Sequence, residues 1–139
     1  MPIQPTGAAN IRGRIELLPE LNPGLKDLDG FSHIILLYHF HQIQGEELVV
    51  TPFLDLEARG IFATRAPKRP NPIGLSIVKL TGIDDSTLYI ENVDILDGTP
   101  LLDIKPYVPE FDHFSVERVG WLGKTREKVQ SKRSDNRFR

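Results

Sequence analysis

Seven consecutive residues, Ala66 to Pro72, contain three prolines and separate two runs that look like core strands. Proline fixes its own φ angle and restricts the residue before it, so neither a helix nor a central strand can pass through this stretch. The stretch is therefore predicted to be a stiff loop. The stretch contains two cations, Lys68 and Arg69, and a third, Arg65, directly precedes it. A stiff loop loses little entropy when it binds a ligand, although a plain surface turn with solvated cations is the alternative.

Short strand-like runs make up most of the remaining chain. Alternating or continuous apolar patterns predict strands at residues 11–18, 31–41, 48–53, 61–64, 73–80, 86–95 and 101–108. A short helix is predicted with Asn22 as its cap and Pro23 at its first position, ending at Gly30. A second helix is predicted at residues 119–131.

This pattern predicts an all-β fold, or a β-rich α+β fold. We expect a compact β-barrel with a short helix and a C-terminal peripheral helix or tail, because many short strands occur without β-α-β alternation. The expected domains are residues 1–123, the barrel, and residues 124–139, a basic tail. No glycine-rich nucleotide motif follows a predicted strand, which argues against a Rossmann nucleotide-binding site.

Composition excludes several classes of protein. The 139 residues include no cysteine, so disulfides and thiolate metal sites are absent from the chain. No apolar run reaches the length of a membrane span, and no signal peptide is visible. A cytoplasmic protein without membrane association is therefore the simplest expectation.

Charge is distributed unevenly along the chain. Residues 124–139 carry seven cations and two acids, while the whole chain has a net charge of −2. A basic tail on an acidic body suggests an anionic partner such as RNA. Lys124, Arg126 and Lys128 are candidate contacts to it, and a solvated, frayed terminus is the alternative.

Two further stretches carry groups with possible chemistry. In an extended run, Asp103, Lys105 and Tyr107 project to one face, after an acidic turn at Asp97 to Pro100. The alternative is an ordinary turn followed by a half-buried strand with an ion pair. A second stretch contains His39 and His41, which share a strand face. We expect these histidines to form hydrogen bonds at a strand end and expect no metal site.

Taken together, three stretches resemble one family. Ala63-Thr64-Arg65 with the run from Arg69 to Gly74 is similar to the central signature of the TsaA-like (TrmO-type) family. The turn at residues 97–100 with residues 103–107 resembles a second signature, and Phe31-Ser32-His33 with Phe40-His41-Gln42 resembles a third. The three stretches occur in the order found in the family and cover roughly residues 2–112.

The resemblance implies a function. Members are β-barrel methyltransferases that use S-adenosylmethionine to methylate N6 of threonylcarbamoyl-adenosine at position 37 of tRNA, and the cofactor lies near a homodimer interface. A Pro-Arg-Gln motif of the family corresponds to Pro2-Ile3-Gln4, with isoleucine in place of arginine. By motif, the implied cofactor contacts are Gln4, His41, Gln42, Arg65, Leu75, Asp97, Gly98, Thr99 and Pro100.

The remaining roles follow from the chemistry of that reaction. The N6 proton must leave, and His41, Asp103 and Tyr107 are candidate acceptors that the sequence does not rank. Candidate contacts to the anionic substrate are Lys68, Arg69, Asn71 and Lys105. The alternative is a module that binds S-adenosylmethionine or RNA without turnover. Ile3 supports that alternative, as does the expectation that the chain begins after the family's first strand.

Overall fold

The computed structural model describes residues 11–52, 55–91 and 93–123, and the chain divides into two compact units. The first unit combines Met1–Tyr38 with Leu75–His113, and the second combines His39–Gly74 with Phe114–Arg139. Each unit therefore joins segments that are distant in sequence. The boundary expected at residue 123 stays a prediction, since the tail after it lies outside the described residues.

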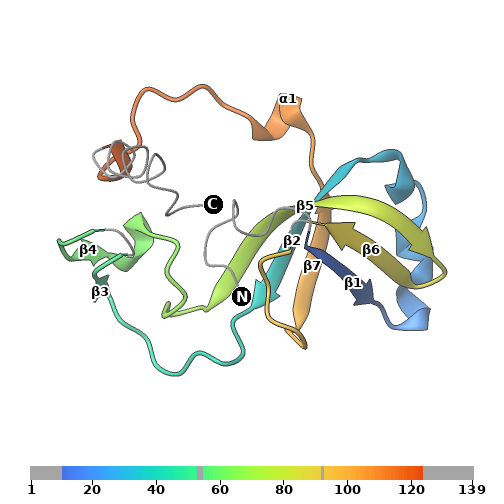
Figure 1. Ribbon diagram of the computed structural model, residues 1–139, viewed down its shortest axis with the longest axis horizontal. Coiled ribbons are helices and arrows are strands. Elements are labelled where there is room, and N and C mark those ends of the chain that lie inside the picture. The colour runs from blue at the N-terminus through green and yellow to red at the C-terminus, as the bar shows by residue number, and fades with distance from the viewer. Residues whose placement is uncertain (1–10, 53–54, 92, 124–139) are drawn as a thin grey trace. The chain divides into compact units, whose positions relative to one another are not determined.

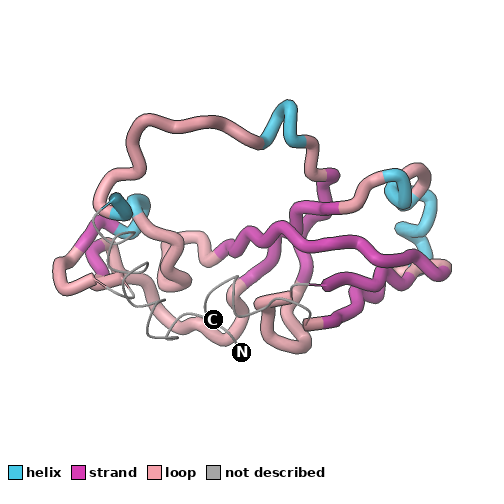
Figure 2. The backbone as a smooth tube through the Cα atoms, turned by 45° about the horizontal axis from the view of Figure 1, so that its top comes forward, coloured by secondary structure: helices cyan, strands magenta, loops and turns pink. Residues whose placement is uncertain are grey.

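A five-stranded sheet dominates the first unit (Figure 1). Its strands are β1 (Arg12–Glu16), β2 (His33–His39), β5 (Ile73–Asp84), β6 (Thr87–Glu91) and β7 (Leu101–Pro106). Their order across the sheet is β1-β6-β5-β2-β7, and the β1–β6, β5–β6 and β2–β7 pairs are antiparallel. Strands drawn in magenta greatly outweigh the few helical turns (Figure 2). The predominantly β character is thus confirmed.

The expected closed barrel is not confirmed. β1 and β7 form the two edges of the five-stranded sheet, which stays open in the described part of the chain. Two predicted strands, at residues 48–53 and 61–64, do not join this sheet. Instead β3 (Val49–Val50) and β4 (Arg59–Gly60) form a separate two-stranded sheet in the second unit. β3 and β4 pair with each other and therefore do not connect the edges of the larger sheet at β1 and β7.

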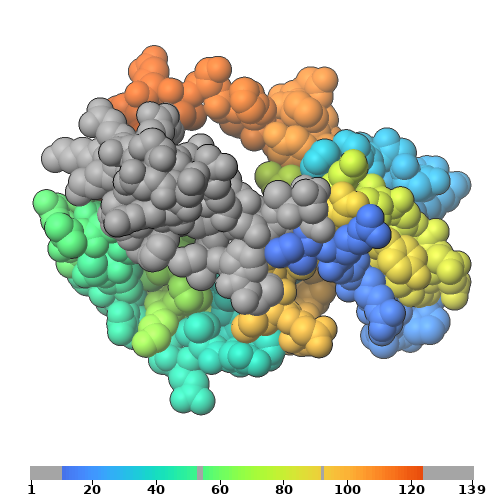
Figure 3. Space-filling view, viewed as in Figure 1, coloured from blue at the N-terminus to red at the C-terminus, as the bar shows by residue number. Residues whose placement is uncertain are grey.

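Alternation of side chains builds the core of the first unit. In β2, Ile34, Leu36 and Tyr38 are buried at every second position. The neighbouring strands contribute buried apolar side chains at Val78, Leu80, Leu88 and Ile90. Burying each large aliphatic side chain stabilises the fold by roughly 1.5–3 kcal/mol. At the surface, β1 (blue) lies beside β6 (yellow), as their pairing requires (Figure 3).

The first helical segment begins earlier than predicted. A 3₁₀ helix spans Pro19–Leu25, with proline near its start, and a second spans Leu28–Gly30. Asn22 therefore lies inside a helix and does not cap one. Its Nδ2 donates to Asp85 Oδ1 and to Ser86 Oγ, both at 3.1 Å. The amide thus braces the turn between β5 and β6.

The strand predicted at residues 61–64 is wrong. Ile61–Ala63 forms a 3₁₀ helix, and the backbone nitrogen and Oγ1 of Thr64 donate to the Ile61 carbonyl at 3.1 and 2.8 Å. This carbonyl is satisfied locally and needs no partner strand. Ile61 is nevertheless buried, which explains the strand-like apolar pattern.

The C-terminal part of the described chain is largely irregular. A single helical turn, α1 (Pro109–Asp112), follows β7. Of the helix predicted at residues 119–131, the described part shows two turn hydrogen bonds, from Leu122 to Val119 and from Gly123 to Gly120. Asn92, within the strand predicted at residues 86–95, lies outside the described residues. Among the described helices, none has the length and apolar character that crossing a membrane requires.

Candidate functional site

The proline-rich loop of the second unit is held together by one of its own cations. Arg69 Nη1 donates to the carbonyls of Thr64 at 2.8 Å and Ala66 at 3.1 Å. The Arg69 guanidinium also lies 5.9 Å from the centre of the Phe62 ring. Arg69 therefore has a role inside the loop that the sequence analysis missed. Its predicted contact to substrate stays a prediction.

Backbone hydrogen bonds stiffen the same loop. The Arg69 and Ile73 nitrogens each donate to the carbonyl two residues earlier, at 2.8 Å. These are three-residue turns, and Pro72 at the centre of the second has its φ fixed by the ring. The Phe40 nitrogen donates to the Pro72 carbonyl at 2.8 Å, and Lys68 Nζ lies 3.7 Å from Glu47 Oε1. The loop is thus tied to the segment that carries His41 and Gln42.

Arg65 contrasts with Arg69. Its side chain is exposed and, within the described ranges, has no hydrogen bond or ion pair. A guanidinium offers five donors in a planar fork, which suits a carboxylate or phosphate. His41, Gln42 and Asn71 are also exposed in this unit. The loop therefore uses one guanidinium internally and presents the other to solvent.

The acidic turn of the first unit is built to expose its carboxylate. Gly98 has φ of +80°, a left-handed conformation that glycine adopts without strain. Thr99 closes the turn, since its backbone nitrogen and Oγ1 donate to the Leu96 carbonyl at 3.2 and 2.6 Å. Asp97 remains exposed, and Pro100 follows at the surface. Leu75, on β5 in the same unit, is 49% exposed.

A buried chain of hydrogen bonds connects this turn to the sheet. The Tyr38 hydroxyl lies 2.8 Å from Ser76 Oγ, and Ser76 Oγ donates to Asp94 Oδ1 at 2.8 Å. Because the serine proton is directed at Asp94, the tyrosine donates to the serine. Burial raises the pKa of Tyr38, which therefore stays a donor at neutral pH. Ser76 adjoins Leu75, and Asp94 precedes the Asp97 turn, so the three side chains fix both predicted contact segments within this unit.

Asp103 and Lys105 form the ion pair that the sequence left as an alternative. Asp103 Oδ2 lies 2.9 Å from Lys105 Nζ, and Asp103 Oδ1 accepts the Ile104 backbone nitrogen at 2.8 Å. The hydrogen bond from Lys105 is the main reason that the pKa of Asp103 is lowered. Tyr107 directly follows β7, and its nitrogen donates to the His33 carbonyl at 3.1 Å. An acid held ionised by a cation is a weaker proton acceptor than an unpaired one.

The predicted site residues fall into two groups. The first unit holds Leu75, Asp97, Gly98, Thr99, Pro100, Asp103, Lys105 and Tyr107, and the second holds His41, Gln42, Arg65, Lys68, Arg69 and Asn71. Gln4, Lys124, Arg126 and Lys128 lie outside the described residues. Within those that are described, no three His, Asp or Glu side chains form a group that could hold a metal ion.

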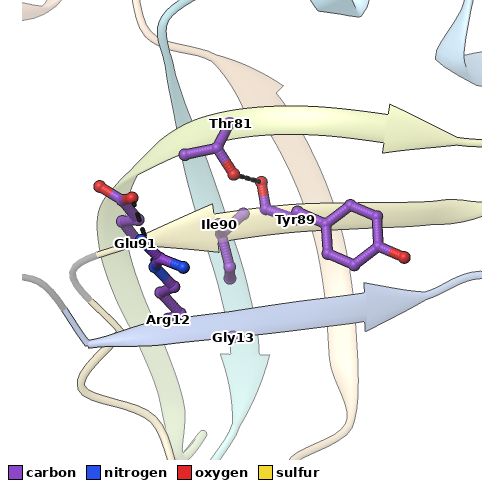
Figure 4. A pocket seen from close by; sticks show the side chains of 6 residues that line it. All are labelled: Arg12, Gly13, Thr81, Tyr89, Ile90 and Glu91. Carbon is purple, nitrogen blue, oxygen red and sulfur yellow. Dashed lines mark hydrogen bonds and ion pairs between the residues drawn. The ribbon is translucent and has the colours of Figure 1, made fainter.

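The first unit also has a shallow pocket, which lies on β1, β5 and β6. It has a volume of about 360 Å³ and is lined by Arg12, Gly13, Thr81, Tyr89, Ile90 and Glu91. Arg12 and Glu91 converge at one end, 3.9 Å apart, and the Tyr89 ring extends along β6 at the other (Figure 4). None of the predicted site residues lines this pocket, so we do not assign it to the candidate site.

Comparison with known proteins gives a consistent result. The sequence pattern of the "tRNA-methyltransferase O N-terminal domain" family matches residues 1–113. A Pyrococcus abyssi protein named "Probable S-adenosyl-L-methionine-binding protein" is 54% identical over 138 residues, which are 99% of this chain and 75% of the relative. The human "tRNA (adenine(37)-N6)-methyltransferase" is 41% identical over 105 residues, 73% of this chain and 23% of the relative.

Solved structures are similar as well. The crystal structure of TrmO from Pseudomonas aeruginosa is 43% identical, with a TM-score of 0.70, and the match covers 86% of this chain and 53% of that one. The chain thus spans three quarters of the archaeal relative, about half of the bacterial structure and about a quarter of the human enzyme.

Proposed function

Because the chain belongs to the tRNA-methyltransferase O N-terminal domain family, we propose that it methylates N6 of adenosine 37 in tRNA, with S-adenosylmethionine as methyl donor. The observation that carries the proposal is Arg65, which is exposed and unpaired among the described residues, on a loop that Arg69 and the prolines hold stiff. We further propose threonylcarbamoyl-adenosine as the substrate. Its carboxylate suits the exposed Lys68 and Asn71 of that loop.

The available side chains fit the chemistry of the cofactor. Its carboxylate matches the guanidinium fork of Arg65, and its ammonium group or ribose hydroxyls match the exposed carboxylate of Asp97. Leu75 offers an apolar surface that is 49% exposed. When bound, the cofactor supplies an activated methyl group. The residues of the chain would contribute chiefly by positioning N6 against it.

The proton on N6 needs an acceptor. Asp103 is paired with Lys105 and has a lowered pKa, which weakens it as a base. The His41 side chain is exposed and has no hydrogen bond or ion pair within the described residues, so we propose it as the acceptor. Tyr107 remains the third candidate, placed directly after β7.

Assembly and location belong to the same proposal. We propose that the chain acts as a homodimer in the cytoplasm, where its tRNA substrate occurs. The open sheet edges at β1 and β7 leave backbone groups that a partner could cover. Light scattering at micromolar concentration with the cofactor present tests the dimer. A monomer under these conditions would contradict it.

A binding module without turnover is the second candidate, favoured by the pairing of Asp103 with Lys105. A methyl-transfer assay on tRNA that lacks the N6-methyl group, read by mass spectrometry of the nucleosides, separates the two. Methylated adenosine at position 37 supports the enzyme. Cofactor and tRNA binding with no product supports the module.

Arg65→Ala tests the cofactor site directly. Loss of the fork should weaken S-adenosylmethionine binding by roughly 1.5–3 kcal/mol, the scale of a charged hydrogen bond. Arg118→Ala, which removes another exposed cation of the second unit, is the matched control and should bind normally. Calorimetry measures both. Equal affinity of the two variants would remove Arg65 from the site.

The basic tail is tested by cutting the chain after Gly123. Seven cations are lost, so tRNA affinity should fall and its dependence on salt should become less steep, because fewer counterions are released. Cofactor affinity should not change. Filter binding at two salt concentrations measures the slope, and identical slopes for the cut and full-length chains would contradict an RNA-binding tail.

A further inference from the structure

The single tryptophan of the chain contacts the loop that carries Arg65. Trp121 Nε1 donates to the Ala63 carbonyl at 2.8 Å. Ala63 ends the 3₁₀ helix that leads into the loop, two positions before Arg65. Trp121 lies beyond residue 113, where the match to the family ends. A residue outside the matched domain therefore contacts a segment that belongs to the candidate site.

A fixed cation holds the indole from another direction. The Arg59 guanidinium lies 5.7 Å from the centre of the Trp121 ring. Arg59 is itself held by Asp55 Oδ2 at 2.8 Å and Glu57 Oε2 at 3.0 Å. Asp55 Oδ1 in turn accepts the backbone nitrogens of Leu56 and Glu57. The Trp121 ring thus lies against a guanidinium that two carboxylates hold in place. All of these residues belong to the second unit.

Hydrogen bonds also fix the two neighbours of Arg65, Thr64 and Ala66. Thr64 follows Ala63, and its carbonyl accepts Arg69 Nη1 at 2.8 Å. Ala66 donates its nitrogen to Thr64 Oγ1 at 3.2 Å, and its carbonyl accepts the same Arg69 nitrogen. Between these fixed neighbours, the Arg65 side chain is exposed and has no hydrogen bond or ion pair within the described residues. Its direction therefore depends on the position of the peptide at Ala63 and Thr64.

We propose that Trp121 is a positioning residue that fixes the Arg65 loop in its binding conformation. The identity of the ligand, the carboxylate of S-adenosylmethionine, rests on the proposed function. The positioning itself does not. In this proposal, a residue that follows the matched family domain, residues 1–113, holds the loop of that domain that carries Arg65.

Trypsin cleavage after Arg65 in the native, cofactor-free protein tests the positioning, because the protease cuts a peptide that opens locally. Trp121→Ala should raise this rate about tenfold. Trp121→Phe keeps a ring beside Arg59 but removes the donor, and should raise the rate about threefold. Phe114→Ala removes a 73% exposed aromatic of the same segment and should leave the rate unchanged. Cleavage after Arg14 in β1, which should not change, reports global unfolding.

Cofactor calorimetry on the same variants tests the link to function. Affinity should fall with the cleavage effect, most in Trp121→Ala, less in Trp121→Phe and not at all in Phe114→Ala. Wild-type cleavage rates after Arg65 in both Trp121 variants would overturn the proposal. Faster cleavage with unchanged affinity would overturn the link to the ligand. If even the wild-type chain fails to bind the cofactor, the proposed function fails while the cleavage result still decides the role of Trp121.

Discussion

Two regions of the molecule hold their predicted contact residues in different ways. In the first unit, Tyr38, Ser76 and Asp94 form a chain of short hydrogen bonds against the sheet. In the second, Arg69 and Trp121 donate to carbonyls of an irregular backbone. A sheet satisfies its own backbone, so its side chains can bond to one another. A loop has no ladder, so long side chains must satisfy its carbonyls.

The difference also concerns exposure to water. Tyr38 and Ser76 are buried, at 7% and 8% exposure, so a lost partner leaves a polar group without water to replace it. Arg69 is only partly buried. Water and salt can reach the second network and compete with its bonds. Each hydrogen bond among Tyr38, Ser76 and Asp94 should therefore stabilise the fold more than a bond of the second network, and should depend less on salt concentration.

Ser76→Ala is expected to have the largest effect on stability. It removes the donor to Asp94 and the acceptor for Tyr38, and should lower the free energy of unfolding by roughly 1.5–3 kcal/mol. Thr81→Ala removes an exposed hydroxyl bond on the same strand and should cost about 0.5 kcal/mol. Urea unfolding at low and high salt measures both. A strong salt dependence of the loss in Ser76→Ala would contradict the proposed insensitivity of the buried network to salt. Equal losses in Ser76→Ala and Thr81→Ala would contradict its greater strength per bond.

Arg69→Ala and Arg65→Ala should have opposite profiles. Removing Arg69 frees two carbonyls that water can partly satisfy, so we expect a loss of about 1–2 kcal/mol in the free energy of unfolding. Removing Arg65 should change stability by less than about 0.5 kcal/mol while weakening cofactor binding. Parallel unfolding and calorimetry test this pair. Equal destabilisation by the two substitutions would contradict the assignment of a structural role to Arg69 and not to Arg65.

Acid should loosen the second network at Asp55, with an effect smaller than the two above. Its hydrogen bond from Arg59 lowers the pKa of Asp55, so the stabilisation is present above the unfolded value near 3.9 and is lost as pH falls through the folded value. Asp55→Asn should therefore destabilise the protein at pH 7 and have little effect near pH 2. Thermal unfolding across this range measures the difference. A constant difference at all pH values would exclude the ion pair as its cause.

Sequence patterns predicted the regular parts of the fold well. β2, β5 and β7 lie where alternation and apolar runs placed them, because period-two burial leaves a direct signature. The pattern failed at Ile61, since a buried side chain in a 3₁₀ turn gives the same local signal as one in a strand. It also failed to show that the sheet stays open, because closure depends on which strands pair and not on their number.

The candidate site was predictable only as a set of residues. Arg65 and Arg69 have the same chemistry in the sequence, and only the hydrogen bonds to Thr64 and Ala66 separate an internal brace from an available donor. Ser76 lies 38 positions from Tyr38 and 18 from Asp94, distances over which no local pattern extends. Trp121 and Ala63 are 58 positions apart. Contacts of this kind follow from the fold and are invisible before it is known.

The strand order has a consequence for the time course of folding. In the five-stranded sheet, only the β5–β6 pair joins strands adjacent in sequence, through a turn in which Asp85 has φ of 55°. β2 is flanked by β5 and β7, both of which are made long after it. At ordinary rates of translation, this apolar strand waits on the order of seconds on the ribosome before either neighbour exists. The hairpin of β5 and β6 is therefore the natural nucleus, and β2 is the segment that chaperones would have most reason to shield.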